Sequence, residues 1–165
     1  ETSDVRRLLI GSSDGFFYTD DEGIIINQST GLESPLDWGE FYRFIIKGDS
    51  DNAVIYALVK EWDDGNKVSI YKSNDLGESF QRIYSDNLGS NGSYDIWTYQ
   101  YEDSDIFFLK EGALYKLSNS TIPSNEEPVF VSEITSSGSG DNLLTGGLDE
   151  DIFMYAKISD QLYFS

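Results

Sequence analysis

The chain of 165 residues contains neither cysteine nor histidine. The lack of cysteine excludes disulfide bonds, but a chain of this length can bury a sufficient core without them. The lack of histidine excludes, within this chain, zinc sites with histidine ligands and catalysis that uses imidazole as a base. Proline is also scarce, and its three residues fall in expected loops.

Basic residues are few, with 11 Lys and Arg against 30 Asp and Glu and a formal net charge of −19. This charge repels nucleic-acid phosphates and anionic membranes, so we expect no binding to nucleic acid. Cationic partners and divalent cations are what such a surface attracts. Solubility alone is the simpler reason for an acidic surface.

Long apolar runs are missing as well. No run approaches the roughly 20 residues of a membrane helix, so we expect no membrane insertion. The first residues, Glu1 to Asp4, lack the basic and apolar regions of a signal peptide. We therefore expect any targeting segment to have been removed or to lie outside this sequence.

Short apolar segments alternate with turn residues throughout the chain. Tyr and Phe, which favour strands, number 11 and 10. Each segment has four to eight residues, the usual length of a strand. The sequence therefore predicts an all-β protein. The expected strands are 7–10, 15–19, 24–27, 41–47, 53–60, 68–73, 79–84, 96–101, 106–110, 113–117, 129–134, 143–147, 152–157 and 161–164.

An acidic turn recurs along the chain, each time before an apolar strand. Its second aspartate lies at steps of 47, 54 and 46 residues, at Asp4, Asp51, Asp105 and Asp151. Periods near 40–50 residues with several strands each are typical of β-propeller blades. We expect one segment, 1–165, with units at about 1–34, 35–92, 93–138 and 139–165. The first unit lacks an inner strand and the last an outer one, which favours an excerpt of a longer propeller over a closed four-bladed ring.

One short motif carries a family resemblance. Residues 73–80 match the pattern S-x-D-x-G-x-x-[WF] at every defined position, with Ser73, Asp75, Gly77 and Phe80. A degenerate copy at 19–26 has Thr19, Asp21 and Gly23, with Ile26 in place of the aromatic. The pattern resembles the Asp box, or bacterial neuraminidase repeat. The resemblance implies a β-propeller of four-stranded antiparallel blades, about four of them here, with each box between the third and fourth strands.

The residue types of the motif suit a turn. Aspartate accepts hydrogen bonds from backbone amides of its own turn, and glycine adopts the left-handed conformation that a Cβ penalises. The hydroxyl adds a local hydrogen bond, and the aromatic packs against the blade. We therefore interpret Asp75 as a structural residue rather than a catalytic acid.

Sialidases are the enzymes that this resemblance suggests. The resemblance implies that a sialidase active site would contain three arginines that hold a carboxylate, a Tyr–Glu nucleophile pair and an aspartic acid. The arginines here are Arg6, Arg7, Arg43 and Arg82. Arg6 and Arg7 face opposite sides of a strand, and Arg82 lies in an outer strand. Three convergent arginines are not expected, and we predict no catalytic residues in this segment.

Other glycosidases need two facing carboxylates, which the acidic turns offer. The candidates are Asp49, Asp51, Asp103, Asp105, Asp149 and Asp151. Their recurrence in several units favours turn chemistry, because an enzyme site occurs once. A Ca²⁺ site at 49–52 is a weaker alternative. No complete calcium loop is present, so we expect no metal site and no cofactor.

Exposed aromatics suggest a ligand surface. We single out Trp62, at an expected hairpin tip, with Trp38 and Arg43 as speculative ligand-binding residues. Trp97, Tyr99 and Tyr101 share one strand face, which is more simply core. Three Asn-x-Ser/Thr sites, at Asn27, Asn91 and Asn119, match the glycosylation pattern.

The sequence thus favours a non-catalytic module that binds a protein or glycan ligand, or neighbouring subunits of an assembly. The resemblance implies an extracellular, surface or virion-associated setting. Two alternatives stay open: a fragment of a glycoside hydrolase, and a structural protein of a virion or cell-surface assembly.

Overall fold

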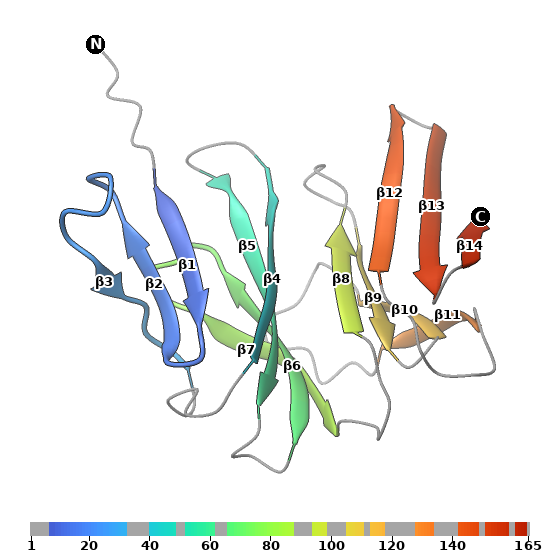
Figure 1. Ribbon diagram of the computed structural model, residues 1–165, viewed down its shortest axis with the longest axis horizontal. Coiled ribbons are helices and arrows are strands. Elements are labelled where there is room, and N and C mark those ends of the chain that lie inside the picture. Colours follow the sequence, from blue (N-terminus) through green and yellow to red (C-terminus); the bar gives the residue numbers. More distant parts are fainter. Residues whose placement is uncertain are drawn as a thin grey trace. The chain divides into compact units, whose positions relative to one another are not determined.

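The computed structural model confirms that the protein is all-β (Figure 1). The structure describes residues 7–32, 40–48, 52–61, 66–87, 94–98, 105–110, 113–117, 128–133, 142–148, 151–158 and 161–164. Every element among these residues is a strand. None of the described residues belongs to a helix long and apolar enough to cross a membrane.

The strands of the described residues form four antiparallel sheets, each in chain order. The first sheet contains β1 (Leu8–Ser12), β2 (Gly15–Thr19) and β3 (Asn27–Gln28). The second sheet contains β4 (Glu40–Lys47), β5 (Val54–Glu61), β6 (Lys67–Ser73) and β7 (Gln81–Asn87). The third contains β8 (Tyr94–Thr98), β9 (Ile106–Lys110), β10 (Ala113–Leu117) and β11 (Val129–Glu133). The fourth contains β12 (Asn142–Leu148), β13 (Asp151–Ile158) and β14 (Gln161–Phe164).

Two-residue connections join β1 to β2 and β13 to β14. Ser12 pairs with Gly15 across two residues, and Ile158 pairs with Gln161 in the same way. Each sheet falls within one of the four units predicted from the repeat, so each unit supplies its own strands. The wholly antiparallel order follows from this local connectivity.

One predicted strand was wrong over most of its length. The segment 24–27 was expected to be a strand, but β3 covers only Asn27–Gln28. The amide of Ile25 donates instead to Asp21 Oδ1, at 2.9 Å, so the chain stays in a turn here. The segment 79–84 also begins late, because β7 starts at Gln81.

The chain divides into two compact units, residues 1–87 and 88–165. In the first unit, the first and second sheets share one core around the buried ring of Phe16. This ring makes edge-on contacts with the rings of Phe44, Tyr71 and Phe80, at centroid distances of 5.2, 6.0 and 4.7 Å. Aromatic side chains thus join the two sheets of this unit.

In the second unit, the fourth sheet lies against the third through β12, which contacts β8 and β9. The third sheet buries Ile96, Ile106, Phe108 and Leu109. The rings of Phe108 and Tyr115 stack at 5.3 Å between neighbouring strands. Each unit therefore contains a pair of sheets in contact.

Candidate functional site

The motif at residues 73–80, here called the second turn, connects β6 to β7. Hydrogen bonds between its own residues stabilise it. The hydroxyl of Ser73 donates to Asp75 Oδ1 at 2.7 Å and accepts from the amide of Gly77 at 2.8 Å. Asp75 Oδ1 also accepts from the amide of Ser79 at 2.9 Å. The second carboxylate oxygen, Oδ2, accepts from the Ser79 hydroxyl. Both oxygens of Asp75 are thus used within the turn.

The motif at residues 19–26, here called the first turn, repeats this geometry after β2. The hydroxyl of Thr19 donates to Asp21 Oδ1 at 2.7 Å and accepts from the amide of Gly23 at 3.0 Å. Asp21 Oδ1 accepts from the amide of Ile25 at 2.9 Å. These three bonds of the second turn therefore recur atom for atom. Ile25 stands where the second turn has serine, so it supplies no hydroxyl.

Both turns also share an unusual backbone. Glu22 and Leu76 have φ values of 60° and 58°, and the glycines after them, Gly23 and Gly77, have 93° and 91°. Glycine adopts positive φ at little cost, but Glu22 and Leu76 carry a Cβ and need a compensating structure. The side-chain hydrogen bonds of the motif supply that structure in both turns.

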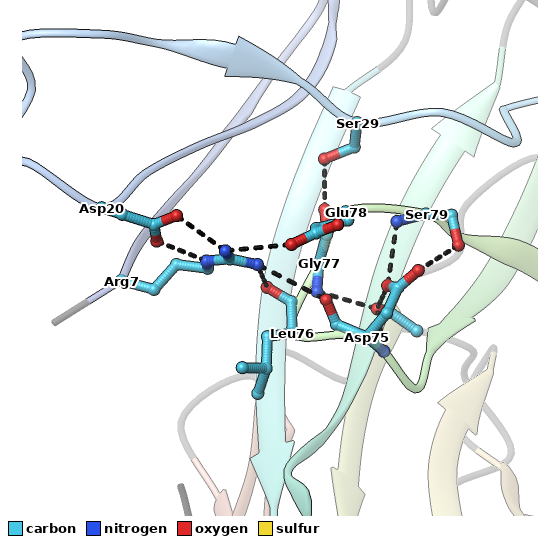
Figure 2. Close-up of polar contacts among 9 residues, drawn as sticks. Arg7, Asp20, Ser29, Asp75, Leu76, Gly77, Glu78 and Ser79 are labelled. Atoms are coloured by element: carbon cyan, nitrogen blue, oxygen red, sulfur yellow. Dashed lines mark hydrogen bonds and ion pairs between the residues drawn. The ribbon is translucent and has the colours of Figure 1, made fainter. Parts of the chain in front are cut away.

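Among the residues that the structure describes, another sheet contacts the second turn, whereas the apolar end of the first turn is exposed. The Ser29 hydroxyl donates to the Gly77 carbonyl at 2.5 Å (Figure 2). The amide of Thr30 donates to the Glu78 carbonyl at 3.0 Å, and the amide of Phe80 donates to the Thr30 carbonyl at 2.9 Å. The chain just after β3 therefore binds the second turn through backbone as well as side-chain atoms.

Arg7 also binds the second turn, beside Ser29 and Thr30. Figure 2 shows its guanidinium between Asp20 and the second turn. It donates to both carboxylate oxygens of Asp20, at 2.6 and 2.7 Å, and to Glu78 Oε1 at 3.1 Å. It also donates to the Leu76 carbonyl at 3.2 Å, and it lies 4.4 Å from the centre of the Tyr18 ring. One side chain thus connects the first sheet to both turns.

These contacts shift the acidity of the carboxylates. The hydrogen bond from Arg7 lowers the pKa of Asp20. The hydrogen bond from the Ile25 amide, followed by that from Thr19, lowers the pKa of Asp21. Burial acts to raise the pKa of Asp75, but the hydrogen bonds from Ser79 and Ser73 together outweigh it, and the net pKa is lowered. All three groups are held ionised.

A buried polar cluster in the second sheet lies apart from the turns. Glu61 is 7 % exposed, and its carboxylate accepts from the hydroxyls of Ser69, at 2.6 Å, and Tyr71. Arg82 lies 3.5 Å from Glu61 Oε2. Sequence reasoning placed Arg82 in an outer strand without a role and did not single out Glu61. The strand register brings Glu61 opposite Lys67, two positions from Ser69, which sequence alone did not specify.

Of the speculative ligand residues Trp38, Arg43 and Trp62, the described part of the chain includes Arg43. Arg43 is half-buried on β4, where it pairs in register with Leu58. Trp38 and Trp62 lie outside the described residues, as do Tyr99 and Tyr101. Trp97 belongs to β8.

The acidic repeat is described at two of its aspartates, Asp105 and Asp151. Asp105 precedes β9, and its Oδ2 lies 2.9 Å from the Nζ of Lys116. Asp49, Asp51, Asp103 and Asp149 lie outside the described residues, and Asp151 begins β13. No group of three or more acidic side chains placed to hold a metal ion occurs among the described residues.

The covering residues of the second turn were missed by sequence reasoning. Arg7, Ser29 and Thr30 gave no pattern of their own, and Ser29 was noted only as part of a glycosylation pattern. Their role depends on which sheet lies beside which. Comparison of the sequence with models of protein families finds no match. Comparison with curated proteins also finds no matching relative.

Proposed function

We propose that this chain is a β-propeller segment of the Asp-box type that serves as a non-catalytic binding or assembly module. Two features support the fold. Antiparallel sheets follow one another along the chain at the spacing of the repeat. Within each compact unit, residues 1–87 and residues 88–165, one sheet contacts the next. The two turns at 19–26 and 73–80 carry the same three hydrogen bonds at the place expected of Asp boxes.

The hydrogen bonding of the Asp75 carboxylate supports the proposed function. Both of its oxygens accept hydrogen bonds from residues of its own turn. The carbonyls around it are bound by Arg7 and Ser29 of the first sheet. The Asp75 carboxylate therefore closes its own turn, and the carbonyls of that turn join it to the first sheet. Its oxygens are engaged within the turn rather than directed at a substrate. This favours a scaffold whose loops meet a protein or glycan partner, and the resemblance to Asp-box proteins is our reason for proposing a setting outside the cytoplasm.

The glycoside hydrolase alternative draws on one contact. A tyrosine hydroxyl against a carboxylate is the pair that sialidase-like catalysis needs, and Tyr71 meets Glu61 in this way. Both residues are enclosed, however, with Tyr71 0 % and Glu61 7 % exposed. A buried pair that also bonds Ser69 is better suited to holding the neighbouring strands β5 and β6 together than to attacking a sugar.

An assay of glycoside cleavage together with glycan binding tests the proposal. The purified chain is incubated with a panel of fluorogenic glycosides that includes a sialoside, and is applied to a glycan array. We expect no release of the fluorophore. Release that Glu61→Gln abolishes, and that the exposed-carboxylate control Glu78→Gln retains, would establish the enzyme instead.

A further inference from the structure

The first sheet has an apolar surface that no other described part of the chain covers. Leu8 at the start of β1 is 56 % exposed, and the three isoleucines of the first turn, Ile24, Ile25 and Ile26, are 84, 60 and 56 % exposed. Phe16 of the same sheet is 0 % exposed, since it packs against the second sheet. Covered and uncovered apolar residues thus occur in one small sheet.

The uncovered residues occupy positions that the second sheet buries. Aligning the turns by their shared hydrogen bonds places Ile26 at the position of Phe80. Leu8 pairs with Thr19 as Ile55 pairs with Ser73, so Leu8 takes the position of Ile55. Phe80 and Ile55 are each only 3 % exposed and belong to the core between the sheets.

The same alignment shows what kind of surface covers such a face. In the first unit the cover is an antiparallel sheet that contributes Phe16 from its second strand and Leu9 from its first. Leu9 pairs with Tyr18, two positions along from Phe16. The uncovered face therefore fits a sheet with apolar residues at these three positions.

The fourth sheet repeats those positions. Ile158 and Gln161 flank two residues as Ser12 and Gly15 do. This register places Leu162 at the position of Phe16, and the pair Tyr155 and Phe164 at the positions of Leu9 and Tyr18. All three are apolar or aromatic. The fourth sheet thus has apolar residues at the register positions that a sheet packing on the exposed face of the first sheet would need.

We propose that the chain associates with itself head to tail, with the fourth sheet of one copy covering Leu8 and Ile26 on the first sheet of the next. The proposal rests on the assembly function above and names a second copy as the partner. Two chains of −19 charge repel each other, so association strengthens as salt rises. Because the two surfaces differ, the contact is heterologous and leaves an open end on each dimer.

Sedimentation velocity of the full chain and two variants tests this proposal. We expect the wild-type chain to exceed 18.6 kDa with rising concentration and salt, and Ile26→Glu to remain a monomer. Ile46→Glu is the matched control, since Ile46 is 55 % exposed on β4 and lies outside the proposed contact. A monomeric wild type, or equal effects of the two variants, overturns the proposal without touching the fold or the lack of catalysis.

A mixing experiment identifies the two surfaces. Leu162→Glu alone, like Ile26→Glu alone, should remain a monomer. An equimolar mixture should form a dimer that grows no further, because one variant keeps an intact first sheet and the other an intact fourth sheet. A mixture that stays monomeric, while both variants keep the wild-type circular dichroism spectrum, contradicts a head-to-tail contact.

A photo-crosslinker in place of Ile26 gives a second readout that does not depend on Leu162→Glu folding. We expect crosslinked dimers in which the label reaches residues 151–164 of the second copy. Crosslinks to another part of the second copy, or crosslinks confined to a monomer, overturn the proposal.

Discussion

The turns at 19–26 and 73–80 share three hydrogen bonds and the same pair of positive φ values, but their surroundings differ. The second turn binds Arg7, Ser29 and Thr30 of the first sheet. The first turn ends in three exposed isoleucines. The comparison separates what the motif does by itself, which is to close a turn, from what a neighbouring sheet adds.

The largest predicted effect is that of Gly31→Ala. Gly31 has φ +84°, and an added Cβ would lie 2.0 Å from the Phe80 carbonyl oxygen. A backbone atom cannot rotate away, so the contact between the sheets has to open. We expect a loss of about 3–4 kcal/mol in the free energy of unfolding, measured by urea denaturation, from strain and overpacking together.

Gly23→Ala is the matched control for Gly31→Ala, since Gly23 also has positive φ but open space around it. Its loss should be about 1–2 kcal/mol, from backbone strain alone. Similar losses for the two variants would mean that the cover of the second turn contributes little.

The next effect distinguishes the two motif glycines. A Cβ on Gly77 would lie 2.5 Å from Leu9 Cδ2, whereas a Cβ on Gly23 meets nothing within 4 Å. Gly77→Val should therefore destabilise the protein more than Gly23→Val, by about 1 kcal/mol, because Leu9 can move only partly. Urea denaturation of both variants measures the difference. Gly77→Val without any loss of stability would show that this turn is not held as described.

Replacing Arg7 tests the contact between the first sheet and the second turn without removing any hydrogen bond internal to either turn. Arg7→Gln removes its bonds to Asp20 and Glu78, whose side chains are 39 and 54 % exposed. Since solvent screens such pairs, we expect a loss of only about 1 kcal/mol. Hydrogen exchange should accelerate at residues 73–80 and not at residues 94–98 of the other unit. Arg7→Lys should recover little, because lysine cannot reproduce the two-pronged bond to Asp20.

The smallest effect concerns pH. The folded-state pKa of Asp75 lies below its unfolded value of about 3.9, so its contribution is present above that pH and is lost as pH falls through the folded pKa. Asp75→Asn should be less stable than wild type at neutral pH and should lose less stability on acidification. Urea midpoints from neutral to acid pH measure this slope. Equal slopes would show that the Asp75 hydrogen bonds do not stabilise the carboxylate.

Much of the local structure was predictable from the sequence. The apolar segments gave the strands, because each is bounded by turn residues and has the length of a strand. The motif identified Asp21, Asp75 and their partners within each turn, because those hydrogen bonds join residues only two to four positions apart. The exception is 24–27, where the amide of Ile25 bonds to Asp21 and not to a neighbouring strand.

The sequence by itself determined the all-β class, the repeat and the closed turns, since these depend on short-range patterning and local hydrogen bonds. Only the tertiary structure decided that Arg7 and Ser29 cover the second turn, and that Glu61 meets Tyr71 and Arg82. These contacts join residues far apart in sequence or set by strand register, and no local pattern encodes which sheet lies against which. The same reason leaves Leu8 and Ile26 apolar but uncovered, because their neighbour is fixed by packing between sheets.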